Sequence, residues 1–247
     1  NTSILGALKL TGKTSEGLSL GILESLTSTE YARISSPGND YKMIAEPMTN
    51  YLAGRLQKDL NNSNTIIGGM ITSTYRNLNK SYLNNLGKSA VTGGIDFKHF
   101  IKDKTYSLEL KALGSQINGD PEAITQLQKE SSRYYQRPDA PHLDLDTTSG
   151  VLRGTGGSLE ILKVSKGHWR YGAGVHWMTP GMELNDMGFQ SMADFIMEGQ
   201  MVGYVENTPK GIFREFEMSI GQLNFWNFGG EYISSDIELE TQFMFKN

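Results

Sequence analysis

Alternation of apolar and polar residues along extended segments is the feature that most constrains this fold. In the segment 89–101, Ile95 and Phe97 share one parity, whereas Asp96 and Lys98 share the other. Successive side chains of a β-strand point to opposite faces, so this spacing predicts a strand with one apolar and one charged face.

The alternation resumes directly after a short turn at 102–104. In the segment 104–116, Leu108 and Leu110 alternate with Glu109 and Lys111. Two such segments joined by a tight polar turn predict an antiparallel hairpin. Its apolar face must touch either the core of a soluble protein or lipid.

Similar segments recur along the whole chain and predict about eleven strands, many of them longer than the roughly 5–6 residues usual in globular proteins. We expect strands near 3–13, 17–27, 47–60, 64–75, 89–101, 104–116, 149–163, 167–178, 194–206, 211–223 and 230–246. The predicted fold class is all-β and antiparallel.

The connections between these strands alternate between short and long. Tight polar turns are expected at 13–17, 61–64, 102–104, 165–167 and 207–211, and long segments lie at 28–46, 76–88, 117–148 and 179–193. In an up-and-down sheet alternate connections lie at the same end, so one rim would hold the short turns and the other nearly all the long loops. This asymmetry is typical of an outer-membrane β-barrel.

The last expected strand indicates the environment of each face of the sheet. Ile237 and Leu239 share one face, and Asp236, Glu238 and Glu240 share the other. Three neighbouring carboxylates would be costly in a dry core, whereas a water-filled lumen tolerates them. We therefore expect the apolar face to touch lipid in a transmembrane β-barrel, with a soluble β-sandwich as an alternative.

Aromatic residues gather near both ends of the expected strands. They are Phe100, Tyr106, Trp169, Phe213 and Phe243 near the short turns, and Tyr75, Trp177, Trp226 and Tyr232 near the long loops. Aromatic girdles at both lipid–water interfaces are expected of a transmembrane barrel. The alternative reading is the general enrichment of aromatic residues in strands.

Composition narrows the classes of function. Among 247 residues, 38 % are hydrophobic, none is Cys and the formal charge is −4. The acidity argues against a nucleic-acid partner, and the lack of Cys excludes disulfide and thiolate chemistry. The sequence starts beside a strand pattern without a signal peptide, and an odd strand count is unusual, so we expect an incomplete segment of a larger barrel.

The long 117–148 segment carries most of the candidate site residues, and we expect it to be extracellular or to plug the lumen. Residues 121–130 predict a short helix after Asp120. Ligand-binding or lumen candidates are Arg133, Tyr134, Tyr135, Arg137, Asp139, Asp144 and Asp146, joined by Glu183, Asn185 and Asp186 in the 179–193 segment. Aromatic and guanidinium groups would suit a sugar or peptide, and paired carboxylates would suit Ca²⁺. The favoured interpretation is a plug in which Arg and Asp pair.

Motifs for other chemistry are weak. His99, His142, His168 and His176 lack metal-ligand spacing, and no dinucleotide or phosphate-binding motif has the strand–helix context that it needs. We therefore predict no metal and no cofactor.

Five segments together resemble one known family. They are LGALKLTGKTSEGLSLGIL (5–23), EPMTNYLAGRLQKD (46–59), ESSRYYQRPDAPHLDLD (130–146), TPGMELNDMGF (179–189) and NFWNFGGE (224–231). The chain resembles the barrel-forming C-terminal region of Bacteroidota outer-membrane proteins that carry an N-terminal family-nine-type carbohydrate-binding domain. The resemblance implies a location in the outer membrane of a Gram-negative bacterium, and it implies glycans as a ligand class.

These observations lead to one main functional hypothesis and one rival. The main hypothesis is a non-enzymatic outer-membrane barrel that binds or passes ligands, or acts as a subunit of an envelope complex. Its partners would be outer-membrane lipid, other envelope proteins and a glycan. The rival is a membrane-embedded hydrolase, for which Ser131, Ser132, His142 and Asp144 are the candidate groups.

Overall fold

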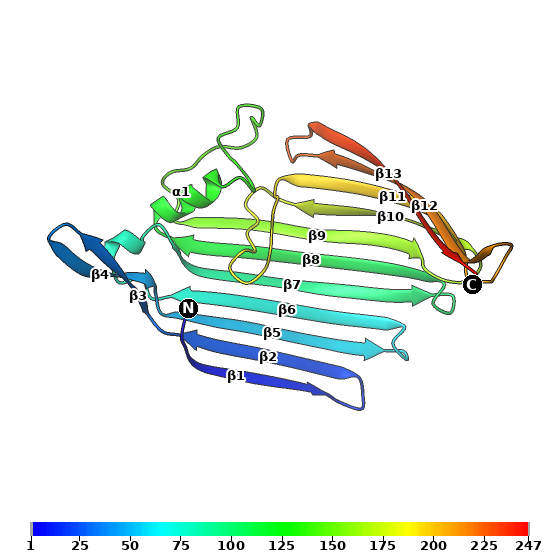
Figure 1. Cartoon of the computed structure of the whole chain (residues 1–247), viewed down its shortest axis with the longest axis horizontal. Coiled ribbons are helices and arrows are strands. Elements are labelled where there is room, and N and C mark those ends of the chain that lie inside the picture. The colour runs from blue at the N-terminus through cyan, green and yellow to red at the C-terminus, as the bar shows by residue number, and fades with distance from the viewer. Residues whose placement is uncertain (1, 247) are drawn as a thin grey trace.

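The computed structural model describes residues 2–246, which form one large antiparallel sheet of eleven strands and a separate two-stranded hairpin (Figure 1). The strand order in the sheet is β1-β2-β5-β6-β7-β8-β9-β10-β11-β12-β13, so each strand pairs with its neighbour along the chain once the hairpin is set aside. The strands of the sheet are β1 (Ile4–Lys13), β2 (Leu18–Thr27), β5 (Thr49–Leu60), β6 (Thr65–Arg76), β7 (Gly87–Ile101), β8 (Tyr106–Gly119), β9 (Val151–Lys163), β10 (Trp169–Met178), β11 (Phe195–Glu206), β12 (Phe213–Trp226) and β13 (Tyr232–Phe245). All eleven expected strands are confirmed, as is the all-β antiparallel class.

Two features lie inside the segments expected as loops. The hairpin of β3 (Glu30–Ser36) and β4 (Asn39–Glu46) occupies most of the 28–46 segment, and it was missed because these short strands pair only with each other. Helix α1 (Pro121–Lys129) was predicted. Its N-cap Asp120 accepts a hydrogen bond from the Glu122 backbone N–H at 3.3 Å, and Pro occupies the first turn.

Five short turns lie at one rim of the sheet and the long loops lie at the other, as predicted (Figure 1). The short connection 227–231 between β12 and β13 lies at the long-loop rim and is the exception. Two of the tight turns, 61–63 and 102–104, consist of three successive residues with φ between 49° and 61°. At the same rim, the Val164 N–H donates to the Thr105 carbonyl oxygen at 2.9 Å, so the turn after β9 is hydrogen-bonded to the turn before β8. The alternation of connection lengths was therefore a sound guide to topology.

The described sheet is open. β1 and β13 are its two edges, and they do not pair with each other, so residues 2–246 do not close into a barrel. The sequence predicted an incomplete segment of a larger transmembrane barrel. Across the described residues, the structure shows the eleven-stranded antiparallel sheet of that prediction but no barrel, so the larger barrel stays a prediction.

Strand register places one parity of side chains on each face of the sheet. One face is mainly hydrophobic, and we call it the apolar face. It carries Leu8, Leu20, Leu56, Ile71, Ile95, Leu110, Leu159, Val175, Val202, Ile220 and Leu239. Many of these side chains are exposed, with 64 % of Ile95 and 68 % of Leu239 accessible. The opposite, polar face carries Arg55, Asp96, Lys98, Glu109, Lys111, Glu160, His176 and Glu238.

The buried core lies on the polar face, beneath α1. Ala90, Ile117 and Leu152 come from β7, β8 and β9, and they pack with Ile124 of the helix. Hydrophobic packing therefore fastens α1 to the polar face, while the apolar face of the sheet stays uncovered by the described residues. Within residues 2–246, no helix has the length and apolar character needed to cross a membrane.

Aromatic side chains line both ends of the apolar face. Near the short turns, the Trp169 and Tyr204 rings are 5.3 Å apart and those of Phe213 and Phe243 are 5.4 Å apart. Near the long loops, Trp226 lies 5.6 Å from Tyr232. Phe100 does not join the first group: it pairs in register with Ser107 on the polar face, and the Lys98 ammonium lies 5.0 Å from its ring.

Candidate functional site

The two longest loops meet over the polar face at the long-loop rim. One is the segment 120–150, which includes α1, and the other is the segment 179–194. The Ala193 N–H donates to the Ser132 carbonyl oxygen at 2.7 Å, which ties the two loops together through their backbones. Two Arg–carboxylate pairs reinforce this junction, and we call Arg133, Arg137, His142, Glu183 and Asp194 the loop cluster.

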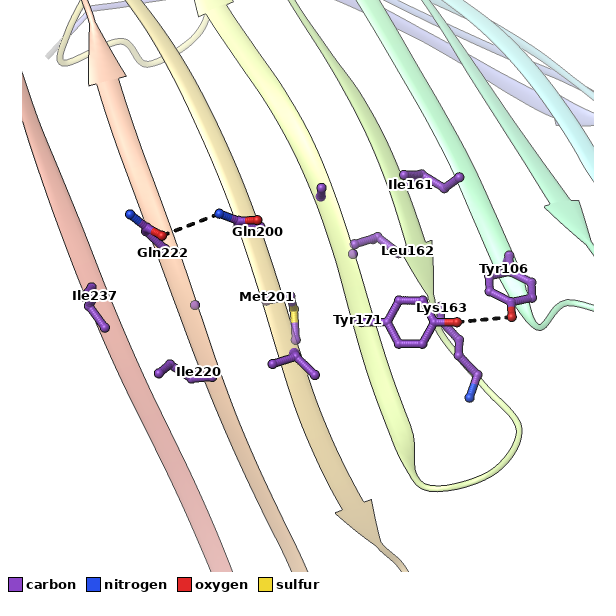
Figure 2. Close-up of a pocket in the computed structure, with 14 residues that line it drawn as sticks. Tyr106, Ile161, Leu162, Lys163, Tyr171, Gln200, Met201, Ile220, Gln222 and Ile237 are labelled. Carbon is purple, nitrogen blue, oxygen red and sulfur yellow. Dashed lines mark hydrogen bonds between the residues drawn. The ribbon is translucent and has the colours of Figure 1, made fainter. Parts of the chain in front are cut away.

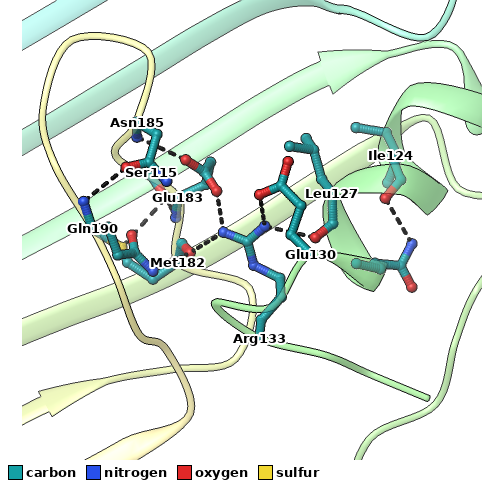
Figure 3. Close-up of polar contacts among 10 residues, drawn as sticks. Ser115, Ile124, Leu127, Glu130, Arg133, Met182, Glu183, Asn185 and Gln190 are labelled. Atoms are coloured by element: carbon teal, nitrogen blue, oxygen red, sulfur yellow. Dashed lines mark hydrogen bonds and ion pairs between the residues drawn. The ribbon is translucent and has the colours of Figure 1, made fainter. Parts of the chain in front are cut away.

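Arg133 of the loop cluster is fully buried, with 0 % of its side chain accessible (Figure 3). Its guanidinium forms an ion pair with Glu183 and donates to the carbonyl oxygens of Met182 at 3.0 Å and Leu127 at 2.7 Å. The planar fork of arginine suits several fixed acceptors at once. Arg133 thus joins α1 to the 179–194 loop.

Glu183 is in turn held by the sheet and by its own loop. Its N–H donates to the Ser115 hydroxyl of β8 at 3.0 Å, and its carboxylate accepts from the Asn185 N–H at 2.7 Å. The Asn185 side chain then accepts from the Gln190 N–H at 2.7 Å. Both predicted residues, Glu183 and Asn185, therefore shape the loop, and Glu183 is also the partner of Arg133.

Asp194 is the second buried carboxylate, with none of its side chain accessible. It forms an ion pair with Arg137, lies 3.0 Å from the His142 Nε2 atom, and accepts from the Phe228 N–H at 3.0 Å. Its φ of +58° is a left-handed conformation that Asp adopts more readily than most residues. Sequence reasoning missed Asp194, because an aspartate just before a strand carries no pattern of its own.

A third pair joins the 179–194 loop to the sheet. Asp186, predicted as a candidate, pairs with Arg76 at the end of β6, and the same guanidinium donates to the Gly87 carbonyl oxygen at 3.0 Å. Two contacts, Arg133–Glu183 and Arg137–Asp194, show the expected pairing between arginines and carboxylates of these loops. That the loops plug a lumen stays a prediction.

The other predicted residues lie away from this buried network. Tyr134, Asp139 and Asp144 are exposed, whereas Tyr135 packs against the core and its burial raises the pKa of its phenol. Burial likewise raises the pKa of Glu130, although Arg133 nearby opposes the shift.

Asp146 closes a turn. Its carboxylate accepts from the Thr148 hydroxyl at 2.7 Å and from the Thr148 and Ser149 N–H groups, and these hydrogen bonds lower its pKa. This carboxylate is therefore used locally rather than shared with Asp144 in a calcium site. Across residues 2–246, no three His, Cys, Asp or Glu side chains are grouped to hold a metal ion.

The arrangement needed by the rival hydrolase is not assembled among the described residues. His142 pairs with Asp194 rather than Asp144, and no hydrogen bond joins it to the hydroxyl of Ser131 or Ser132. Its Nδ1 atom is buried without a hydrogen-bond partner, and a Cβ at Gly229 would meet that atom at 2.4 Å. A general base needs an accessible nitrogen beside the proton it removes, which His142 does not present.

Comparison with protein families matches the whole chain, residues 1–247, to the domain of unknown function DUF5916. The chain belongs to the DUF5916 family. No curated protein matches this sequence. The DUF5916 match does not show whether the chain forms part of a barrel or is associated with a carbohydrate-binding domain. Both stay predictions that follow from the resemblance.

Proposed function

We propose that this DUF5916 chain forms part of the wall of an outer-membrane β-barrel, and that its role is to bind or pass ligands rather than to catalyse a reaction. The observation that carries the proposal is the apolar face, which stays exposed over the whole eleven-stranded sheet. Monomeric soluble proteins rarely expose contiguous apolar patches beyond a few hundred Å².

The dimensions of the apolar face suit a bilayer. Trp169 and Trp177 stand at opposite ends of β10 on this face. At about 3.3 Å per residue, the strand between them is about 26 Å long. A transmembrane strand needs about 9–11 residues, and its apolar band is about 25 Å tall between aromatic girdles.

The polar face supports the same orientation. Arg55 donates to Asp96 at 2.9 Å, and the Lys98 ammonium lies 2.6 Å from the Glu109 carboxylate. These ion pairs are partly exposed, so water can solvate them as it would in a lumen. In this proposal, the unpaired edges of β1 and β13 bond to further strands that complete the barrel, because free strand edges are not tolerated in lipid.

A cavity beneath the 179–194 loop supports a ligand-handling role. It has a volume of about 470 Å³, and its lining includes Arg55, Asp96 and Lys111 from the sheet and Leu184 and Met187 from the loop. Charged side chains can hydrogen-bond the hydroxyl groups of a sugar, and the apolar side chains beside them can pack against its apolar faces. A glycan is therefore the ligand class that we propose, and other envelope proteins are the proposed partners.

The lipid contact of the apolar face can be tested with spin labels, because the chain has no native Cys to interfere. Nitroxides are placed at Leu239 and Ile95 on the apolar face and at Glu238 and Thr92 on the polar face, in protein refolded into lipid vesicles. We expect oxygen, which partitions into lipid, to relax the first two labels more. A water-soluble nickel chelate should relax the other two more. Equal access of the chelate to all four labels would contradict the proposal.

A further inference from the structure

We propose that the apolar face carries a specific site for a phospholipid with an anionic headgroup, in the part of β8–β13 that adjoins the short-turn rim. The inference rests on the proposed membrane location and adds a defined lipid partner to it. A groove of about 610 Å³ lies there, and its apolar side chains include Ile161, Val202, Ile220 and Ile237 (Figure 2).

The groove follows from the side-chain sizes on the register row that crosses it. Ile161 of β9 pairs with Ala173 of β10, which pairs with Gln200 of β11. Ala173 is short, so the surface is hollowed between its larger neighbours. Farther along the row, the Gln200 amide donates to the Gln222 side chain at 3.5 Å, so the two amides partner each other on an otherwise apolar surface.

The rim end of the groove gathers cationic and phenolic groups. The hydroxyl oxygens of Tyr106 and Tyr171 are 3.3 Å apart, and the Lys163 ammonium lies 5.8 Å from the centre of the Tyr171 ring. The Lys102 ammonium lies 5.8 Å from the centre of the Tyr106 ring. Within residues 2–246, no carboxylate lies at ion-pair distance from either lysine.

This combination fits one amphipathic occupant. Two ammonium groups and two phenol hydroxyls can hold a phosphate, while the adjoining groove takes hydrocarbon. A soluble phosphate compound would leave the groove empty, and a neutral lipid would leave the two lysines without a counter-charge. Each basic group near a membrane surface favours anionic lipid by about 1 kcal/mol, or about fivefold.

Trp169 offers a reporter beside this site, because it lies on the same face of β10, two residues before Tyr171. A variant with Trp177→Phe and Trp226→Phe retains it as the single Trp. The folded variant is placed in phosphatidylcholine vesicles that contain either brominated phosphatidylglycerol or brominated phosphatidylcholine at equal mole fraction. We expect several-fold stronger quenching of Trp169 by the brominated phosphatidylglycerol.

Matched variants test the origin of this preference. Lys102→Gln with Lys163→Gln should abolish it, and the charge-conserving Lys163→Arg should keep it. Lys58→Gln should also keep it, since Lys58 lies on the same face of β5 but donates to the Glu16 carbonyl oxygen at 2.7 Å. A variant that retains only Trp177, at the opposite rim, should show no preference.

The outcomes separate the site from the membrane proposal. Equal quenching of Trp169 by the two brominated lipids would overturn the phospholipid site and leave the membrane location supported. Quenching by neither lipid in correctly folded protein would overturn both. A preference that survives the Lys102→Gln and Lys163→Gln double change would overturn the assignment of the headgroup to these lysines.

Discussion

The Nε2 atom of His142 lies 3.0 Å from both carboxylate oxygens of Asp194, so the two long loops are joined at a buried carboxylate. The Phe228 N–H, from the turn between β12 and β13, donates to the same group. Three connections that are distant in sequence therefore converge on Asp194, and the position of the loops over the polar face depends on it.

Replacing Asp194 should loosen the loops without unfolding the sheet. In Asp194→Ala, Arg137 and His142 lose their common acceptor, and the Phe228 N–H is left unpaired. Breaking a buried ion pair costs about 3–5 kcal/mol. We expect amide hydrogen exchange in the segments 120–150 and 179–194 to accelerate at least a hundredfold, while exchange in β5–β8 stays unchanged.

Asp139→Ala is the matched control, because Asp139 is an exposed carboxylate in the same loop. It should leave exchange in both segments near the wild-type rate. Comparable acceleration in the two variants would show that Asp194 has no special role in holding the loops.

The Arg133–Glu183 pair should show strong coupling between its partners. Glu183→Leu leaves the Arg133 guanidinium buried without its carboxylate, and a cost of about 3–5 kcal/mol is expected. Adding Arg133→Met removes the stranded charge and should recover much of that cost. A double-mutant cycle of thermal unfolding in detergent micelles measures the coupling, and strictly additive effects would contradict it.

Gly154 should be required for the 179–194 loop to lie on the sheet. A Cβ at this position would meet the Met182 backbone nitrogen at 2.1 Å, so Gly154→Ala forces the loop away from β9. Gly21→Ala is the control, since nothing lies within 4 Å of its added Cβ. We expect limited proteolysis to cut the segment 179–194 faster only in Gly154→Ala; resistance equal to wild type would disprove this packing.

The sequence predicted the sheet well because each strand carries its own evidence. Ile237 and Leu239 alternate with Asp236 and Glu238, and a one-residue slip in register would reverse every such assignment. Helix α1 was equally easy to predict, because Asp120 and Pro121 mark its start. These signals are local, so no knowledge of distant contacts was needed.

The loop cluster could be predicted only in part. The sequence placed Arg133 and Glu183 among the candidates, yet their pairing spans 50 residues and depends on how two loops fold over β8. Asp194 carried no signal at all. Phe100 was assigned to an aromatic girdle by its closeness to a turn, whereas its register places it on the polar face.

The turn at Asp146 should lose stability as the medium becomes acidic. The hydrogen bonds from the Thr148 hydroxyl and backbone hold the pKa of Asp146 below its ordinary value of about 4. Because the folded-state pKa is the lower one, the unfolded turn binds the proton more tightly. The stabilisation is therefore complete above about pH 4 and is lost as the pH falls through the folded-state pKa.

Thr148→Val removes the hydroxyl donor and should raise the pKa of Asp146, whereas Asp144→Asn should leave it nearly unchanged. NMR titration of the Ser149 amide measures both effects, and an unaltered midpoint in Thr148→Val would show that the Thr148 hydroxyl does not set this pKa.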